Sequence, residues 1–112
     1  MEINSLEILE QETKQIIYDN WVISLTKDFD LLIIQIKGKN SIFKYEKIIQ
    51  KSSLNKMSIF NLKSITQIID MFFRLIENNK IKFEEIGNSF KLSINYSSTE
   101  HFSLCLNKQV LS

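Results

Sequence analysis

The longest amphipathic pattern of the chain lies in its middle. Between residues 62 and 78, apolar residues recur at the helical period on one side, and charged or amide side chains occupy the other. The apolar side comprises Leu62, Ile65, Ile68, Ile69, Phe72, Leu75 and Ile76, with Met71 and Phe73 at its margins. The pattern predicts a helix over 62–78, capped at Asn61, that packs one face against a sheet.

The C-terminal third alternates between apolar and polar residues, as strands with one buried face do. A two-residue turn at Gly87 and Asn88 gives a register of matching pairs: Phe83 with Leu92, Ile81 with Ile94, and Glu84 with Lys91. A five-residue loop at 97–101 would then align Tyr96 with Phe102, Ile94 with Leu104, and Leu92 with Leu106. We therefore expect a three-stranded meander whose apolar face is covered by the 62–78 helix.

The first half of the chain contains a second set of alternating segments. Residues 21–26 and 31–37 predict a hairpin that turns at 28–30, and a third strand follows from 43 to about 49. Because residues 31–34 are all apolar, we expect this part of the second strand to be covered on both faces. Residues 4–19 predict a helix, and residues 54–60 predict a short one before the long helix.

Together these segments predict an α+β fold in one domain, residues 1–112, with the order α-β-β-β-α-α-β-β-β. An antiparallel sheet of two meanders would be packed by a helical hairpin, and the N-terminal helix would lie against the sheet.

Composition narrows the classes of function. The formal net charge is +1 and Arg74 is the only arginine, which disfavours recognition of duplex nucleic acid. The single cysteine, Cys105, cannot form an internal disulfide and is typical of a reducing compartment. There is no leader pattern and no apolar run near the roughly 20 residues that span a bilayer. We expect an intracellular protein, cytoplasmic or nuclear, that does not enter membranes.

The residues that carry most enzyme chemistry are sparse. His101 and Cys105 form the only pair of nucleophile type, and the expected loop separates them along a strand. One histidine and one cysteine cannot build a four-ligand zinc site, and two isolated glycines cannot form a phosphate loop. We therefore expect no catalysis, no cofactor and no metal.

The aromatic and sulfur-containing side chains offer two interpretations each. Phe29 lies between two aspartates at a hairpin tip, where it either folds back onto the core or anchors a partner. Phe90 is either the margin of the core or exposed at the end of the sheet. Met71 and Phe73 are either covered by another helix or part of an exposed patch that binds another chain.

A late segment resembles a known group of proteins. The run Asn88-Ser89-Phe90-Lys91, followed by alternating apolar positions that end at Phe102-Ser103-Leu104, is similar to the globular head of centriolar cartwheel and DNA end-joining scaffold proteins. In cartwheel heads, a phenylalanine of such a segment inserts into a neighbouring head. The resemblance therefore implies that role for Phe90.

These observations favour a noncatalytic module for protein interaction or self-assembly, which contacts a protein partner or a second copy of itself. The residues expected to make the contact are Phe90, Met71, Phe73 and Phe29. The alternative is a nucleic-acid accessory factor that binds single strands through lysines and surface aromatics.

Overall fold

The computed structural model describes residues 11–39 and 41–110, and its main feature is one antiparallel sheet of seven strands. The strands are β1 (Gln11–Tyr18), β2 (Trp21–Asp28), β3 (Leu31–Gly38), β4 (Phe43–Gln50), β5 (Ile81–Ile86), β6 (Ser89–Asn95) and β7 (His101–Val110). Three helical segments connect β4 to β5: α2 (Lys51–Leu54), the 3-10 helix η1 (Ser58–Phe60) and α3 (Ile65–Glu77). Strands therefore dominate the fold.

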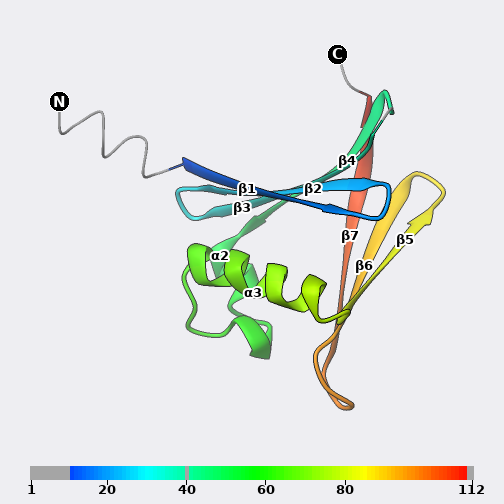
Figure 1. Cartoon of the computed structure of the whole chain (residues 1–112). Coiled ribbons are helices and arrows are strands. Elements are labelled where there is room, and N and C mark those ends of the chain that lie inside the picture. The colour runs from blue at the N-terminus through cyan, green and yellow to red at the C-terminus, as the bar shows by residue number, and fades with distance from the viewer. Residues whose placement is uncertain (1–10, 40, 111–112) are drawn as a thin grey trace, which may run out of the picture.

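The sheet consists of two meanders that share one seam. Its strand order is β1-β2-β3-β4-β7-β6-β5, so the first four strands follow the chain and the last three are added in reverse. At the seam, β4 and β7 pair only between Phe43 and Glu46 on one side and Asn107 and Val110 on the other. Beyond this short ladder the meanders diverge, and α3 crosses the inner side of the curled sheet (Figure 1).

The predicted N-terminal helix over 4–19 is wrong where the structure describes it. Residues 11–18 form β1, which pairs along its whole length with β2, while residues 1–10 lie outside the described part of the chain. Ile16 faces the inner side and is half-buried, whereas the neighbouring Ile17 is 64% exposed on the outer side. An edge strand with one open face needs few apolar residues, so its sequence does not show strong alternation.

The predicted helical hairpin is also wrong. In place of a helix over 54–60, the chain forms one turn of α2 and one turn of η1. The long helix begins at Ile65, three residues later than expected, because Ser64 and Gln67 form a reciprocal capping box. The Ser64 hydroxyl accepts from the Gln67 amide at 3.1 Å, and the Gln67 side chain accepts from the Ser64 amide at 2.9 Å.

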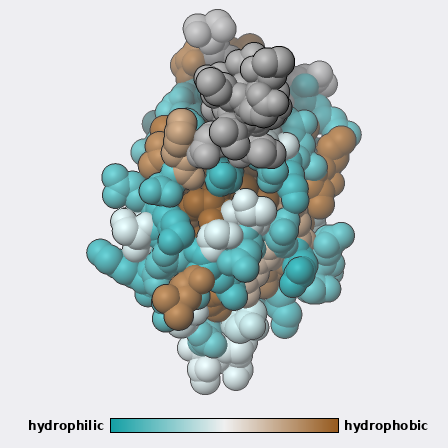
Figure 2. Space-filling model, turned by 90° about the vertical axis from the view of Figure 1, so that its left-hand side faces the viewer, coloured by the Kyte–Doolittle hydropathy of each residue, from teal (hydrophilic) through white to brown (hydrophobic). Residues whose placement is uncertain are grey.

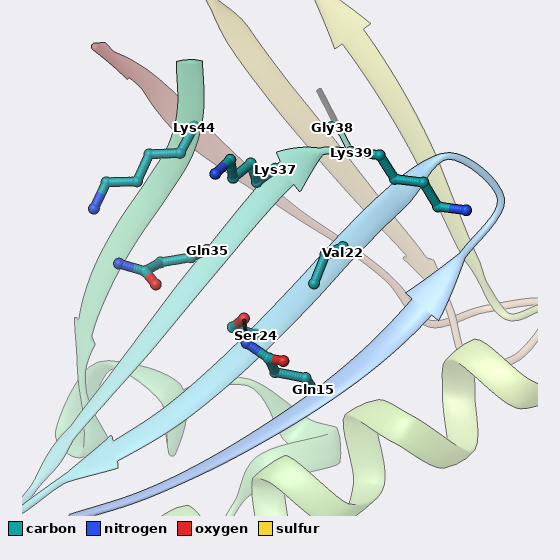
Figure 3. Close-up of a pocket in the computed structure, with 8 residues that line it drawn as sticks. All are labelled: Gln15, Val22, Ser24, Gln35, Lys37, Gly38, Lys39 and Lys44. Atoms are coloured by element: carbon teal, nitrogen blue, oxygen red, sulfur yellow. Dashed lines mark hydrogen bonds between the residues drawn. The ribbon is translucent and has the colours of Figure 1, made fainter. Parts of the chain in front are cut away.

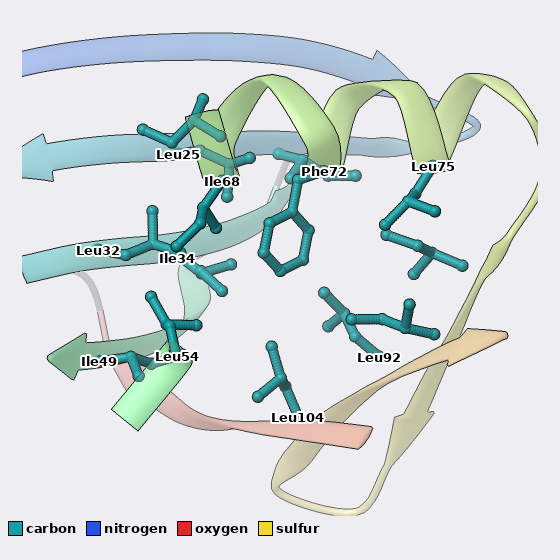
Figure 4. Close-up of a cluster of buried hydrophobic side chains, with 14 of the residues drawn as sticks. Leu25, Leu32, Ile34, Ile49, Leu54, Ile68, Phe72, Leu75, Leu92 and Leu104 are labelled. Carbon is teal, nitrogen blue, oxygen red and sulfur yellow. The ribbon is translucent and has the colours of Figure 1, made fainter. Parts of the chain in front are cut away.

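The core lies between α3 and the inner faces of both meanders. The helix buries six residues, which are Ile65, Ile68, Ile69, Phe72, Leu75 and Ile76. Figure 4 shows Ile68 directed toward Leu25 and Ile34 of the first meander, and Phe72 and Leu75 directed toward the space above Leu92 and Leu104 of the second. Since a fully buried side chain of this size contributes roughly 1.5–3 kcal/mol, the helix holds the two meanders together.

The predicted register of the β5–β6 hairpin is confirmed, including the pairs Phe83 with Leu92 and Glu84 with Lys91. The register of the last hairpin is wrong by two residues, since Ile94 pairs with Phe102 and Leu92 with Leu104. The loop has the expected length of five residues, but it runs from Tyr96 to Glu100 instead of from 97 to 101. A shift of two residues keeps every side chain on its face, so the apolar inner face is unchanged.

The expectation that the start of β3 is covered on both faces is wrong. Leu32 and Ile34 are fully buried on the inner side, but Ile33 on the outer side is only half-buried. Its cross-strand partner Ile48 is 57% exposed. The outer side of the first meander is therefore an open surface within the described part of the chain.

Candidate protein-interaction surface

The tip of the β2–β3 hairpin presents an exposed aromatic ring. Phe29 is 65% exposed, so it does not fold back onto the core. Its backbone has φ +55°, a left-handed conformation that glycine, asparagine and aspartate adopt more readily than phenylalanine. This conformation costs a residue with a side chain about 1–2 kcal/mol. The chain therefore holds a bulky apolar group in water on a strained turn, which is the kind of position that function favours.

The tip rests on the helical segment that follows β4. The carbonyl oxygen of Asp30 accepts a hydrogen bond from the Lys51 backbone amide at 2.8 Å. A shallow pocket of about 420 Å³ lies beside this contact, and its lining includes Asp30, Leu31, Lys51 and Asn55. The turn that contains Phe29 is thus held by β2 and β3 and by the hydrogen bond to α2.

A second exposed apolar side chain, Leu62, lies in the loop between η1 and α3. The Asn55 side chain donates to the carbonyl oxygens of Phe60 at 2.7 Å and Lys63 at 3.1 Å, which fixes the loop that carries Leu62. Leu62 is 92% exposed and has φ +61°. The prediction that it belongs to the apolar side of the long helix was wrong, and the Ser64 and Gln67 capping signature was the signal that could have located it outside the helix.

The exposed apolar side chains on the side of the molecule that contains Phe29 and Leu62 do not form one continuous patch. The β2–β3 turn and the loop before α3 lie on the same side in Figure 1. Figure 2 views that side and shows brown apolar groups divided by hydrophilic residues. The surface is suited to contact through a few anchors and not through one broad apolar area.

Phe90 is part of the core and not of the surface, since it is only 1% exposed. Its ring contacts Trp21 at 4.9 Å, Tyr45 at 5.2 Å and Phe83 at 6.2 Å between ring centroids. The Tyr45 hydroxyl donates to the Glu85 carboxylate. Burial, with the hydrogen bond and charge of Glu85, raises the pKa of Tyr45 to about 12.

Met71 and Phe73 are half-buried and pack against the core. No N-terminal helix covers this side of α3 within the described residues; the edge strand β1 reaches it through Lys14, whose ammonium lies 2.8 Å from the Asp70 carboxylate. This hydrogen bond raises the pKa of Lys14. The two residues thus offer narrow apolar margins and not a patch.

The outer side of the first meander carries a polar groove of about 420 Å³ that sequence reasoning missed. It is lined by Gln15, Val22, Ser24, Gln35, Lys37, Gly38, Lys39 and Lys44. The Gln15 side chain donates to the Ser24 hydroxyl at 3.0 Å, and Gln35 donates to Glu46 at 2.5 Å. In Figure 3 the side chains of Gln35, Lys37 and Lys44 extend to the same side, while Lys39 extends away from them.

The candidates for chemistry lie on the second meander. His101 is held at the start of β7, where its Nδ1 lies 2.8 Å from the Asn95 side-chain oxygen, and Cys105 is exposed further along the strand. Among residues 11–39 and 41–110, no three histidine, cysteine or carboxylate side chains gather in a metal-binding group. In the same part of the chain, no helix is long and apolar enough to cross a membrane.

Comparison with known proteins gives a likeness of fold. No protein-family model matches the sequence, and no curated protein matches it. Among solved structures, the head domain of human CCDC61 superimposes on 90% of this chain and on 99% of its own length, with a TM-score of 0.64 and 9% sequence identity. The predicted resemblance to a globular head domain is therefore confirmed at the level of the fold.

Proposed function

We propose that this chain is a noncatalytic protein-interaction module and that Phe29 is its main anchor. The observation that carries the proposal is a large aromatic side chain that is 65% exposed at φ +55°. Asparagine or glycine at this position would relieve the backbone strain and remove apolar surface from water. A partner that buries the ring would offset both costs.

The surroundings of Phe29 indicate what kind of partner would bind. Asp28 and Asp30 flank the ring, so the complementary surface would be an apolar pocket with basic residues at its rim. Burial of one aromatic ring in such a pocket commonly contributes about 2 kcal/mol or more to binding. The likeness of fold to a head domain supports a binding role but does not identify the partner.

The other expected contact residues have smaller parts in this proposal. Met71 and Phe73 would act only as edge contacts because most of their surface is already covered. Phe90 would bind a neighbour only if the core opened, so we do not assign it an interaction role.

The alternative, binding of single-stranded nucleic acid, has less support. Such proteins place stacking rings inside a basic groove. Here the groove with Lys37 and Lys44 lies at one end of β3, and Phe29 lies between aspartates at the other end.

Affinity capture with matched variants tests the proposal. We expect Phe29→Asn to lower recovery of a specific protein partner at least about tenfold, as loss of an anchor does. The control is Tyr96→Asn, because Tyr96 is also exposed, at 43%, but lies in the β6–β7 loop. Identical recovery with wild type, Phe29→Asn and Tyr96→Asn would contradict the proposal.

A further inference from the structure

We infer that two copies of this chain pack through the outer side of the first meander, antiparallel to each other, as a two-fold dimer. This inference rests on the proposed interaction function and names one partner, a second copy. The surface concerned is the outer face, defined as the outward-facing side chains that the structure describes on β1 to β4, together with the β2–β3 turn and Lys39. Its two ends carry opposite charge, which makes the face complementary to itself.

One end of the outer face carries three lysines and is called the lysine end: Lys37, Lys39 and Lys44. Lys37 and Lys44 are directly opposite in the β3–β4 register, an arrangement in which like charges repel. The Lys44 ammonium lies 3.6 Å from the Glu46 carboxylate, but within the described residues Lys37 has no ion-pair partner. Even with Glu46 and the exposed Asp19 at the neighbouring turn, the lysine end keeps an excess of positive charge.

The other end carries Asp28 and Asp30 on either side of Phe29 and is called the acidic end. Lys51 lines the pocket next to Asp30 and offsets one of the two carboxylates. Lys27, next to Asp28, belongs to the inner side of β2, where it is directly opposite Glu12 in the β1–β2 register. The acidic end therefore keeps an excess of negative charge. Charges of opposite sign thus mark the two ends of one strand pair, β2 and β3.

One copy cannot bring its own two ends together. Strand β3 separates them by eight residues, which at roughly 3.3 Å per residue is about 26 Å of rigid sheet. A second copy related by a two-fold axis that lies in the interface, perpendicular to the strands, satisfies both ends at once. The contact is then isologous, since each acidic end meets the lysine end of the partner.

The register fixes which residues face each other in this arrangement. With β2 over β2 and β3 over β3 of the partner, Val22 would lie over Asp28 and Lys37 over Leu31, and the partner's Asp28 would lie one strand spacing, about 4.8 Å, to the side of Lys37, within reach of its long side chain. Between these rows, Gln35 would lie over Ile33 and Glu46 over Ile48, which covers the exposed Ile48 side chain. Phe29 would reach past these rows to Lys39 and Gly38 of the second copy, where a lysine beside a ring contributes a cation–π attraction.

The size of the face predicts a weak dimer. Eight residues in length and four strands in width correspond to about 26 Å by about 19 Å, or roughly 500 Å² per copy. The two copies together would bury about 1,000 Å², which is at the low end for specific interfaces. We therefore expect a dissociation constant of tens of micromolar or above. Because the ends are charged, salt should weaken the dimer.

Sedimentation equilibrium of the whole chain tests this inference, at protein concentrations from about 10 µM to about 1 mM to match the expected affinity. We expect a reversible monomer–dimer equilibrium. Lys37→Glu with Lys44→Glu should weaken it at least about tenfold, and so should Asp28→Lys with Asp30→Lys, because each change makes both ends alike in charge. An equimolar mixture of the two variants should dimerise again, since opposite charges then meet at both ends.

The control for charge alone is Lys82→Glu with Lys91→Glu, which alters the outer side of the second meander and should leave dimerisation unchanged. Urea unfolding of each variant checks that it folds. Renewed dimerisation in the equimolar mixture remains a valid test even where one variant is less stable than wild type. A chain that stays monomeric at the highest concentration, or variants that do not recover on mixing, would overturn the dimer. If a monomeric wild type still loses a captured partner on Phe29→Asn, the proposed function stands and only the self-contact is refuted.

Discussion

Truncation of Phe90 provides a direct test of its position in the core. Phe90→Ala would remove about 120 Å² of buried apolar surface, which at about 25 cal/mol/Å² amounts to about 3 kcal/mol. Loss of the ring contacts with Trp21 and Tyr45 adds about 0.5–1.5 kcal/mol. We therefore expect the free energy of unfolding to fall by about 4 kcal/mol, within the range for buried phenylalanine.

Urea unfolding followed by fluorescence of Trp21 measures this loss, since the indole lies 4.9 Å from the Phe90 ring. With a slope of about 1.5 kcal/mol/M, the unfolding midpoint should fall by about 2–3 M. Phe90→Leu should lose only about 1–1.5 kcal/mol because it refills most of the volume. A loss below about 1 kcal/mol for Phe90→Ala would refute the assignment to the core and return Phe90 to the surface.

Four further substitutions test other parts of the structure by chemical unfolding. Phe29→Asn and Leu62→Asn should each raise the free energy of unfolding by about 0.5–1 kcal/mol, because asparagine tolerates φ above zero; a loss in either would contradict the strain. Stability should fall between pH 10 and pH 12 as unfolded Tyr45 ionises before the folded form, whose pKa is about 12, and Tyr45→Phe should reduce that fall. Ser64→Ala should cost about 1 kcal/mol through loss of the cap, and an unchanged midpoint would count against the capping box.

The sequence predicted the β5–β6 hairpin in full because local and cross-strand signals agree there. The turn at Gly87, which has φ +57°, and the apolar pairs across it favour the same register. The β1–β2 hairpin lacked such agreement. Its turn uses Asp19 at φ +58°, and Ile16 and Ile17 fit a helical face as well as the two sides of a strand. Only the pairing with β2 distinguishes a strand from a helix at these residues, and that pairing is a tertiary contact.

The register of the β6–β7 hairpin could not be predicted from the apolar pattern alone. Pairing Ile94 with Leu104 or with Phe102 leaves the same side chains on the inner face, so burial does not choose between the two registers. The loop supplies the difference. Glu100 donates its amide to the Ser97 hydroxyl at 3.1 Å, and the His101 ring is bonded to Asn95 at 2.8 Å. These polar contacts close the hairpin one residue earlier than the apolar pattern suggested.

The interaction surface was predictable only in part, for a related reason. The aspartates beside Phe29 indicated a hairpin tip, but the direction of the ring depends on whether the turn places Phe29 at a positive φ. With a positive φ, the side chain of Phe29 points away from the sheet. Phe90, by contrast, is buried because it packs against Trp21 and Tyr45, which are far from it in the sequence. The exposure of an aromatic residue is thus set by backbone conformation and by partners remote in sequence. For that reason, the strained turn at Phe29 is better evidence for a binding role than the abundance of aromatic residues.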